Sequence, residues 1–149
     1  MRPINCACVI LLLVVGCDTI RNIPHAVSKT ATLEIHIVSP TKTATAKLAV
    51  DPGSKAPIYL LTPPFISAAD VESVQRSKDD AQSQALVVNL TPGGATKMTT
   101  MTGKSVGAQI AFVVNGAVVS TPTLTGPISK QFIITGTDAE RLFLQLTQK

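Results

Sequence analysis

Residues 109–120 read QIAFVVNGAVVS, and this stretch gives the most direct local prediction of structure. Two apolar runs, 109–114 and 117–120, are rich in the β-branched residues that favour strands. Asn115 and Gly116 stand between the runs, and Asn-Gly tolerates the two positive φ angles that a type I′ turn requires. The stretch therefore predicts a β-hairpin, and Pro122 is expected to end its second strand.

The sequence after the hairpin predicts one more strand and a final helix. Residues 131–135 form a short apolar run that is typical of a strand. Thr137, Asp138, Ala139 and Glu140 match a capping box, in which side chains satisfy the first free N–H groups of a helix. The predicted helix, 138–148, then has one apolar face, formed by Ala139, Leu142, Phe143 and Leu146.

The sequence before the hairpin predicts a second pairing of strand and helix. Residues 85–90 are apolar on both faces, which indicates a central strand. Thr91 is placed to cap a helix over 92–102, with Pro92 at its first position and Gly103 just past its end.

The first third of the domain predicts short strands. Residues 32–37 alternate strictly, so that Leu33, Ile35 and Ile37 are expected to point inward, and His36 outward to solvent. We also expect strands at 47–50 and 57–62 and a polar loop or hairpin tip at 76–84. A helical turn is expected at 67–74, with Ser67 as its cap and Asp70 near its start.

These elements indicate one domain of the α+β class. The chain has 149 residues, of which 45% are hydrophobic, enough for a single core. We predict a single, mainly antiparallel β-sheet with two α-helices packed on one face, over residues 32–149.

The N-terminal segment resembles the signal of a bacterial lipoprotein. An apolar run over 6–15 is too short to span a bilayer, which needs about 20 apolar residues. It leads into Val-Val-Gly and Cys17, which match a lipobox, so that residues 1–16 are expected to be removed and Cys17 to carry lipid. Asp18 resembles a sorting signal for inner-membrane retention. Residues 17–31 are then a lipidated tether.

The predicted processing determines which cysteines remain in the mature chain and where in the cell the protein is expected. Cys6 and Cys8 fall in the removed segment, so no internal disulfide is expected. The expected location is the cell envelope, lipid-anchored, on the periplasmic face of the inner membrane. The partners expected are the membrane, through Cys17, and a polypeptide or an envelope protein.

No motif in the sequence predicts catalysis or a cofactor. Residues 103–105, Gly-Lys-Ser, lack the upstream glycine and the strand-to-helix context of a phosphate-binding loop. Lys104 and Ser105 are adjacent, and adjacent side chains of an extended chain point to opposite sides. Carboxylate pairs at 70/72 and 79/80 are expected to be solvated loop charges. With 3% aromatic residues and scattered lysines, a base-stacking surface for nucleic acid is not expected. No acid–base or nucleophile constellation is visible, so no small-molecule substrate is expected either.

Residues 107–122 resemble a run in the head subdomain of the first periplasmic domain of SecD, in the SecDF preprotein translocase. The matching features are Gly107, the apolar strand 110–114, Asn115-Gly116, the run 118–120 and Pro122. Weaker matches are the strand and helix start at 88–95, a turn at 134–136 and the helix start at 138–140. The resemblance extends over about residues 33–148 and is strongest over 86–140.

The resemblance implies a function but no catalytic residues. SecD couples proton flow to export through membrane helices, which are not found after this domain, so only the role of the head is carried over: contact with emerging polypeptide. We therefore expect a non-enzymatic, lipid-anchored protein that contacts exported or envelope proteins in translocation. The alternative is a structural or regulatory lipoprotein with one folded partner and no role in export.

Overall fold

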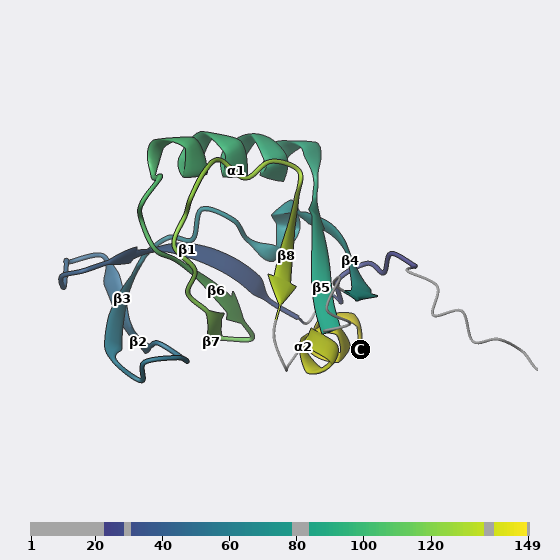
Figure 1. Cartoon of the computed structure of the whole chain (residues 1–149), viewed down its shortest axis with the longest axis horizontal. Coiled ribbons are helices and arrows are strands. Elements are labelled where there is room, and N and C mark those ends of the chain that lie inside the picture. Colours follow the sequence, from purple (N-terminus) through teal and green to yellow (C-terminus); the bar gives the residue numbers. More distant parts are fainter. Residues whose placement is uncertain (1–22, 29–30, 79–83, 136–138, 149) are drawn as a thin grey trace, which may run out of the picture.

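The structure is a computed structural model that describes residues 23–28, 31–78, 84–135 and 139–148. Eight strands and two α-helices form most of this part of the chain (Figure 1). The elements, in chain order, are β1 (Leu33–Ser39), β2 (Ala46–Val50), β3 (Pro57–Leu61), a 3₁₀ turn (Ala68–Asp70), β4 (Val71–Lys78), β5 (Gln84–Leu90), α1 (Pro92–Lys104), β6 (Ile110–Val114), β7 (Ala117–Ser120), β8 (Gln131–Thr135) and α2 (Ala139–Thr147).

The strands form two antiparallel sheets, which confirms the α+β class and corrects the prediction of a single sheet. One sheet has five strands in the order β2-β3-β1-β6-β7, and the other has three in the order β4-β5-β8. The single-sheet prediction was wrong because local patterns define strands but not their partners. Strand β5 pairs with β4 on one side and with β8 on the other, and none of these three strands joins the β6–β7 hairpin.

The core lies between the two sheets. Leu33 and Ile35 of β1 belong to the same buried cluster as Leu86 and Val88 of β5. The rings of Phe112 on β6 and Phe132 on β8 stack at 5.1 Å between centroids. The inner faces of both sheets therefore share one hydrophobic core.

Both helices add to this core, from opposite ends of the strands of the small sheet (Figure 1). Met98 of α1 is fully buried in the cluster, as is Leu146 of α2. The predicted apolar face of α2 is confirmed, since Ala139, Leu142 and Phe143 are also buried. Arg76 of β4 fixes the outer side of α2, with an ion pair to Glu140 of 2.8 Å and its guanidinium over the Phe143 ring.

The predicted hairpin and the start of the first helix are confirmed. β6 and β7 pair in antiparallel register around Asn115 and Gly116, whose φ angles of 49° and 81° are both positive. The Thr91 hydroxyl accepts a hydrogen bond from the Gly94 N–H, as a helix cap does. The helix extends past the predicted end, to Lys104, so Gly103 lies inside it. Thr137 and Asp138 of the predicted capping box lie outside the described residues.

The region 67–84 differs from the prediction. Only Ala68–Asp70 is helical, as a single 3₁₀ turn, and the chain then continues as β4 through Lys78. Ser67 and Asp70 gave a helix-start signal because the Asp70 carboxylate accepts from the Ser67 N–H at 3.0 Å. This bond closes one turn and needs no following helix. Residues 76–84 were predicted to be a loop or a hairpin tip; 76–78 and 84 are strand residues, β4 and β5 pair in antiparallel register as the arms of a hairpin do, and 79–83 lie outside the described residues.

The fold includes residues that the sequence assigned to a tether. His25 and Val74 of β4 exchange two backbone hydrogen bonds of 2.8 Å, and the Ser28 N–H donates to the Leu146 carbonyl of α2. The His25 ring also meets the Phe143 ring edge to face, at 5.2 Å between centroids. The segment 23–28 therefore lies along β4 and the end of α2.

Candidate functional site

The described part of the chain holds no cluster of metal-ligating side chains, and its Gly-Lys-Ser run lies at the end of a helix. No group of three or more His, Cys, Asp or Glu comes together there in the way that metal ligands do. Gly103, Lys104 and Ser105 lie at the C-terminal end of α1, where the Ser105 N–H donates to the Thr102 carbonyl. A helix C-terminus presents carbonyl groups, which do not attract phosphate.

Asp70 is buried, which corrects the prediction of a solvated loop charge. Its carboxylate accepts from Lys97 Nζ of α1 at 2.7 Å and from the backbone and hydroxyl of Ser67. Burial raises the pKa of Asp70, but the bonds from Lys97 and Ser67 outweigh it and lower the pKa overall. The role of Asp70 is to join the 3₁₀ turn to α1.

Asp51 has a comparable structural role at the turn between β2 and β3. Its carboxylate accepts from the hydroxyl and the N–H of Ser54 and from the Thr121 hydroxyl just after β7. The bonds from Ser54 and Thr121 lower the pKa of Asp51 to about 2. The Asp51 carboxylate thus joins the β2–β3 turn to the chain after β7.

His36 is buried, although the alternation of β1 predicted a solvated position. It is 4% exposed, and its ring nitrogens contact the Leu61 carbonyl at 2.8 Å and the Glu34 carboxylate at 3.2 Å. The prediction was wrong because the outer face of the five-stranded sheet carries a second apolar cluster, with Leu60, Ala111 and Val113. Both partners of the ring belong to the same sheet, so the contacts stabilise β1 against β3.

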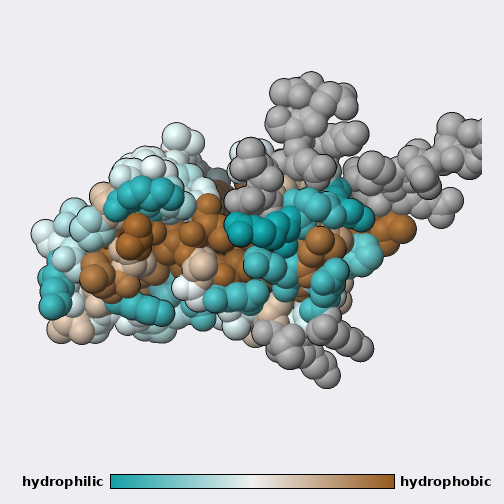
Figure 2. Space-filling view, turned by 90° about the horizontal axis from the view of Figure 1, so that it is seen from below, coloured by the Kyte–Doolittle hydropathy of each residue, from teal (hydrophilic) through white to brown (hydrophobic). Residues whose placement is uncertain are grey.

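The outer face of the large sheet is hollowed into a groove of about 550 Å³, which we call the outer groove. Its floor is formed by His36, Leu60 and Val113, and its walls by the β2 strand on one side and the start of β7 on the other. Leu48 and Val50 on β2 are 62% and 57% exposed, unusually high for large apolar side chains. Figure 2 shows the underside of the molecule, where apolar residues form a band between hydrophilic borders.

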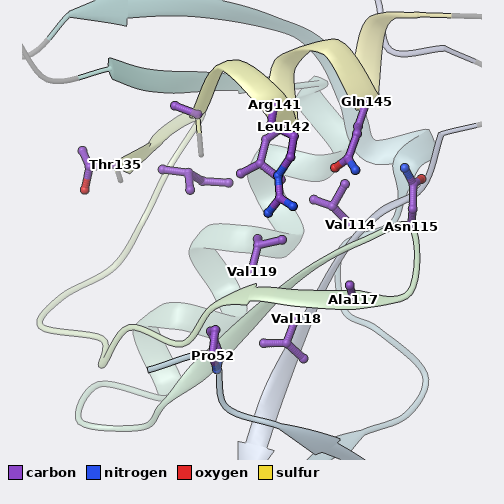
Figure 3. Close-up of a pocket in the computed structure, with 12 residues that line it drawn as sticks. Pro52, Val114, Asn115, Ala117, Val118, Val119, Thr135, Arg141, Leu142 and Gln145 are labelled. Atoms are coloured by element: carbon purple, nitrogen blue, oxygen red, sulfur yellow. The ribbon is translucent and has the colours of Figure 1, made fainter. Parts of the chain in front are cut away.

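A second cavity, of about 320 Å³, lies between β7, the end of β8 and α2, and we call it the β8 hollow (Figure 3). Its apolar lining includes Val114 and Val119 on the hairpin, Ile134 on β8 and Leu142 on α2, together with Pro52 from the turn between β2 and β3. Its polar lining includes Asn115, Thr135, Arg141 and Gln145. Strands β7 and β8 are the end strands of their respective sheets.

Of the site residues predicted from the sequence, the described part of the chain includes the two of the hairpin turn, Asn115 and Gly116. Asn115 lines the β8 hollow and Gly116 lines the outer groove, so the turn separates the two cavities. Asn115 also joins the turn to the start of β1, since its Oδ1 accepts from the Thr32 N–H at 2.9 Å. Cys17 and Asp18, predicted for lipidation and sorting, lie outside the described residues. No helix in the described ranges has the length and apolar character needed to cross a membrane.

A family model and three solved structures match this chain, and all four are of SecDF. The family model of the SecDF P1 head subdomain matches residues 42–148. A structure of SecDF, described as a membrane component that enhances protein export, has a TM-score of 0.60 and 22% identity, over 78% of this chain and 62% of that chain. Comparison with curated proteins finds no match.

Two further SecDF crystal structures have the same fold. SecDF in its super-membrane-facing form has a TM-score of 0.61 and 21% identity, over 78% of this chain and 18% of that chain. SecDF from Thermus thermophilus, described as a translocon-associated membrane protein, has a TM-score of 0.53 and 23% identity, over 78% and 19%. The chain therefore spans less than two thirds of each of these three proteins.

Proposed function

The chain belongs to the SecDF P1 head subdomain family, because that family model matches residues 42–148, and from this membership we propose a role in protein translocation. The resemblance predicted from residues 107–122 is thereby confirmed. In the proposed role the domain contacts polypeptides that emerge on the outer side of the inner membrane, and it performs no chemistry of its own. The related SecDF proteins are described as enhancing protein export and as associated with the translocon.

The observation that carries this proposal is the pair of cavities beside the end strands. Both cavities are open, the outer groove is mainly apolar and the β8 hollow has apolar and polar lining, and each is bordered by an end strand of a sheet. An end strand offers unpaired N–H and C=O groups, which pair with any extended chain with little regard to its sequence. A chain in transit is unfolded and presents both main-chain groups and apolar side chains.

We propose further that Cys17 carries the lipid that holds the domain at the membrane. The lipobox Val14–Gly16 before Cys17 supports this proposal, and Asp18 supports retention at the inner membrane. The intact mass of the membrane form measures the lipid directly. A mature species without the added acyl mass would exclude it, and fractionation of Asp18→Ser measures the sorting separately.

The function is tested by titrating the protein with one exported polypeptide in its unfolded and in its folded form. We expect weak binding of the unfolded form, because an unfolded partner loses conformational entropy when it binds. Binding should change little with added salt, because the net charge is only +4. Equal binding of both forms, or none at millimolar concentration, would favour the structural or regulatory alternative with one folded partner.

A further inference from the structure

The geometry points to the outer edge of β8 as the pairing site for an extended polypeptide, with alternate side chains of that polypeptide entering the β8 hollow. The inference rests on the proposed function and makes it more specific: it identifies the strand that pairs and the sequence pattern that fits. The expected partner is an unfolded segment in which apolar and polar residues alternate.

Among the four sheet ends of the described chain, three have features that oppose the addition of a strand. On β4, His25 already pairs with Val74, and a bulge interrupts the strand between Val71 and Ser73. On β7, the register shifts opposite Phe112 and Val113, and Pro122 follows the strand. On β2, Lys47 lies opposite Leu60, so a charge is placed on the face of an apolar cluster. Bulges, prolines and inward lysines are the usual protections of edge strands.

Strand β8 has none of these protections. Its five residues, QFIIT, contain no lysine, proline or glycine, and they pair with β5 without a register shift. Ile133, at the centre of the strand, is 58% exposed. A regular, apolar and accessible edge is the kind of edge that takes up another strand.

The register shows which main-chain groups of β8 are available. The Leu90 N–H donates to the Lys130 carbonyl at 2.9 Å, so these two residues form a hydrogen-bonded pair of the antiparallel ladder. Hydrogen-bonded pairs alternate along such a ladder, so Phe132 and Ile134 bond to β5. The N–H and C=O groups of Ile133 therefore point away from β5, as do those of Gln131 and Thr135.

The β8 hollow receives the side chains on the inner side of an added strand. It lies beside Ile134 and Thr135, and its lining is apolar at Val119 and Leu142 and polar at Asn115, Arg141 and Gln145 (Figure 3). A cavity of about 150 Å³ holds a benzene-sized group, so about 320 Å³ has room for two such groups. Alternate residues of an added strand point to one face, so two apolar side chains, two positions apart, enter the hollow.

The outer side of an added strand meets a mixed surface, with Ile133 at the centre of the outward face of β8 and the polar Gln131 and Thr135 on either side of it. On the face of β8 that points away from the core, Gln131 donates to Asn89 of β5, and Asn89 donates to Ser73 of β4. Polar side chains on an added strand can extend this row of hydrogen bonds. The apolar part of the β8 hollow on the inner side and the row of Gln131, Asn89 and Ser73 on the outer side favour a segment that alternates apolar and polar residues.

A second copy of this chain fits the site less well than an unfolded segment does. If two β8 edges paired, the inward side chains of the second copy, Phe132 and Ile134, would stay in that copy's own core, where they are 7% and 5% exposed. The β8 hollow would then stay unfilled. An unfolded segment has free side chains on both faces, so it can pair with β8 and fill the β8 hollow at the same time.

The main-chain pairing is tested at Ile133 with the full chain in detergent. The probe is a ten-residue peptide of alternating Val and Thr, flanked by lysines, and its control has the same residues in two blocks. Ile133→Pro removes the outward N–H but no hydrogen bond to β5, and prolines are tolerated on such edges. We expect this variant to weaken binding of the alternating peptide about tenfold or more, whereas Ile133→Thr, which keeps the N–H, changes it less than threefold.

The hollow is tested separately, with variants that are expected to fold. Gln145 is exposed on α2 and lines the β8 hollow, so Gln145→Trp can fill it, whereas Leu144→Trp on the same helix does not line it. We expect Gln145→Trp to weaken peptide binding about tenfold and Leu144→Trp to leave it unchanged. Wild-type binding by all these variants, or equal binding of the block peptide, overturns the inference and leaves the proposed function standing.

Two other results would overturn the inference for different reasons: the absence of any peptide binding, and dimerisation through β8. If the wild-type chain binds neither peptide nor an unfolded exported protein, the proposed function fails together with this inference. A second copy of the chain occupies β8, and the inference is wrong, if three results occur together. The wild-type chain dimerises, Ile133→Pro is the only one of these variants that is monomeric, and the alternating peptide does not dissociate the dimer.

Discussion

Gly94 lies where α1 passes closest to the 3₁₀ turn. A Cβ at this position would be 2.4 Å from the Asp70 carbonyl oxygen and 2.9 Å from the Asp70 Cβ. The backbone of Asp70 cannot move away easily, because its carboxylate is held by Lys97 and its carbonyl accepts from the Thr91 N–H. We expect Gly94→Ala to lower the free energy of unfolding by about 2 kcal/mol, in spite of the better helix propensity of alanine.

Urea unfolding measures the change in stability of Gly94→Ala. Gly93→Ala is the control, since its Cβ would meet nothing within 4 Å, and equal effects of the two variants would contradict the packing argument.

Asp51 makes the stability of the protein depend on pH in the acid range. Its pKa is about 2 in the folded protein, because Ser54 and Thr121 donate to the carboxylate, and near 3.9 in an unfolded chain. Since the folded pKa is the lower one, the stabilisation is complete above about pH 4 and is lost as the pH falls towards 2. We expect the urea midpoint to fall over this range, and to fall less steeply in Asp51→Asn.

Ser54→Ala is the intermediate control for this experiment. It keeps the Asp51 carboxylate but removes the Ser54 hydroxyl, which makes the largest contribution to the lowered pKa. The slope of stability against pH should therefore lie between those of the wild-type chain and Asp51→Asn. Identical slopes in all three proteins would show that Asp51 has no part in the acid dependence.

Single residues were predictable where their role is local. Asn115 and Gly116 define a turn through their own φ angles, so two adjacent residues were enough to predict it. His36 and Asp70 were predicted to be solvated, and both are at most 8% exposed. Their burial depends on Leu61 and Lys97, which lie 25 and 27 residues further along the chain, and no local pattern indicates such partners.

The long segment between β7 and β8 is held to α1 by one buried hydroxyl. Thr102 is fully buried; its hydroxyl donates to the Met98 carbonyl and accepts from the Ile128 N–H at 2.8 Å. Thr102→Val keeps the shape of the side chain but leaves the Ile128 N–H without this acceptor. Because an unpaired buried donor costs about 1–3 kcal/mol, we expect a loss of stability in that range.

Hydrogen exchange of the Ile128 amide measures the effect of Thr102→Val at the position where it arises. Protection of Ile128 should fall by more than the loss of global stability explains. Thr99→Val is the matched control, because its hydroxyl donates to the Ile128 carbonyl from an exposed position and leaves the N–H bonded. Unchanged protection in Thr102→Val would mean that Ile128 is held by other contacts.

Elements were predicted well where the period of the pattern is unambiguous. β1, β5, β8 and both helices lie within a few residues of their predicted bounds. The failure at 67–78 has a physical cause, since the Ser67–Asp70 signature closes one turn whether or not a helix follows. The strand after it, VESVQRSK, carries mixed polar residues because one side of β4 faces solvent. This composition resembled a loop.

At the scale of the molecule, the sequence could predict the class but not the arrangement. Which strands share a sheet depends on contacts between distant segments, such as Phe112 on Phe132, and these follow from packing of the whole core. The candidate site has the same origin. The β8 hollow exists because β7 and β8 end different sheets, with α2 closing the gap between them. The strand 131–135 was predicted, but its position at an edge was not predictable.

The segment 23–28 completes the molecule by covering the edge of β4, and this leads to a prediction about where the stable unit begins. A chain that starts at Ala31 lacks both His25–Val74 hydrogen bonds, the bond from Ser28 to Leu146, and the His25 ring on Phe143. Each net hydrogen bond contributes about 1 kcal/mol, so we expect the shortened chain to be about 2–3 kcal/mol less stable in urea than one that starts at Asp18. His25→Ala in the longer chain removes only the ring and should cost about 1 kcal/mol. If the shortened chain has the same urea midpoint as the longer one, residues 23–28 are a tether after all, and the domain begins where the strand pattern of β1 does.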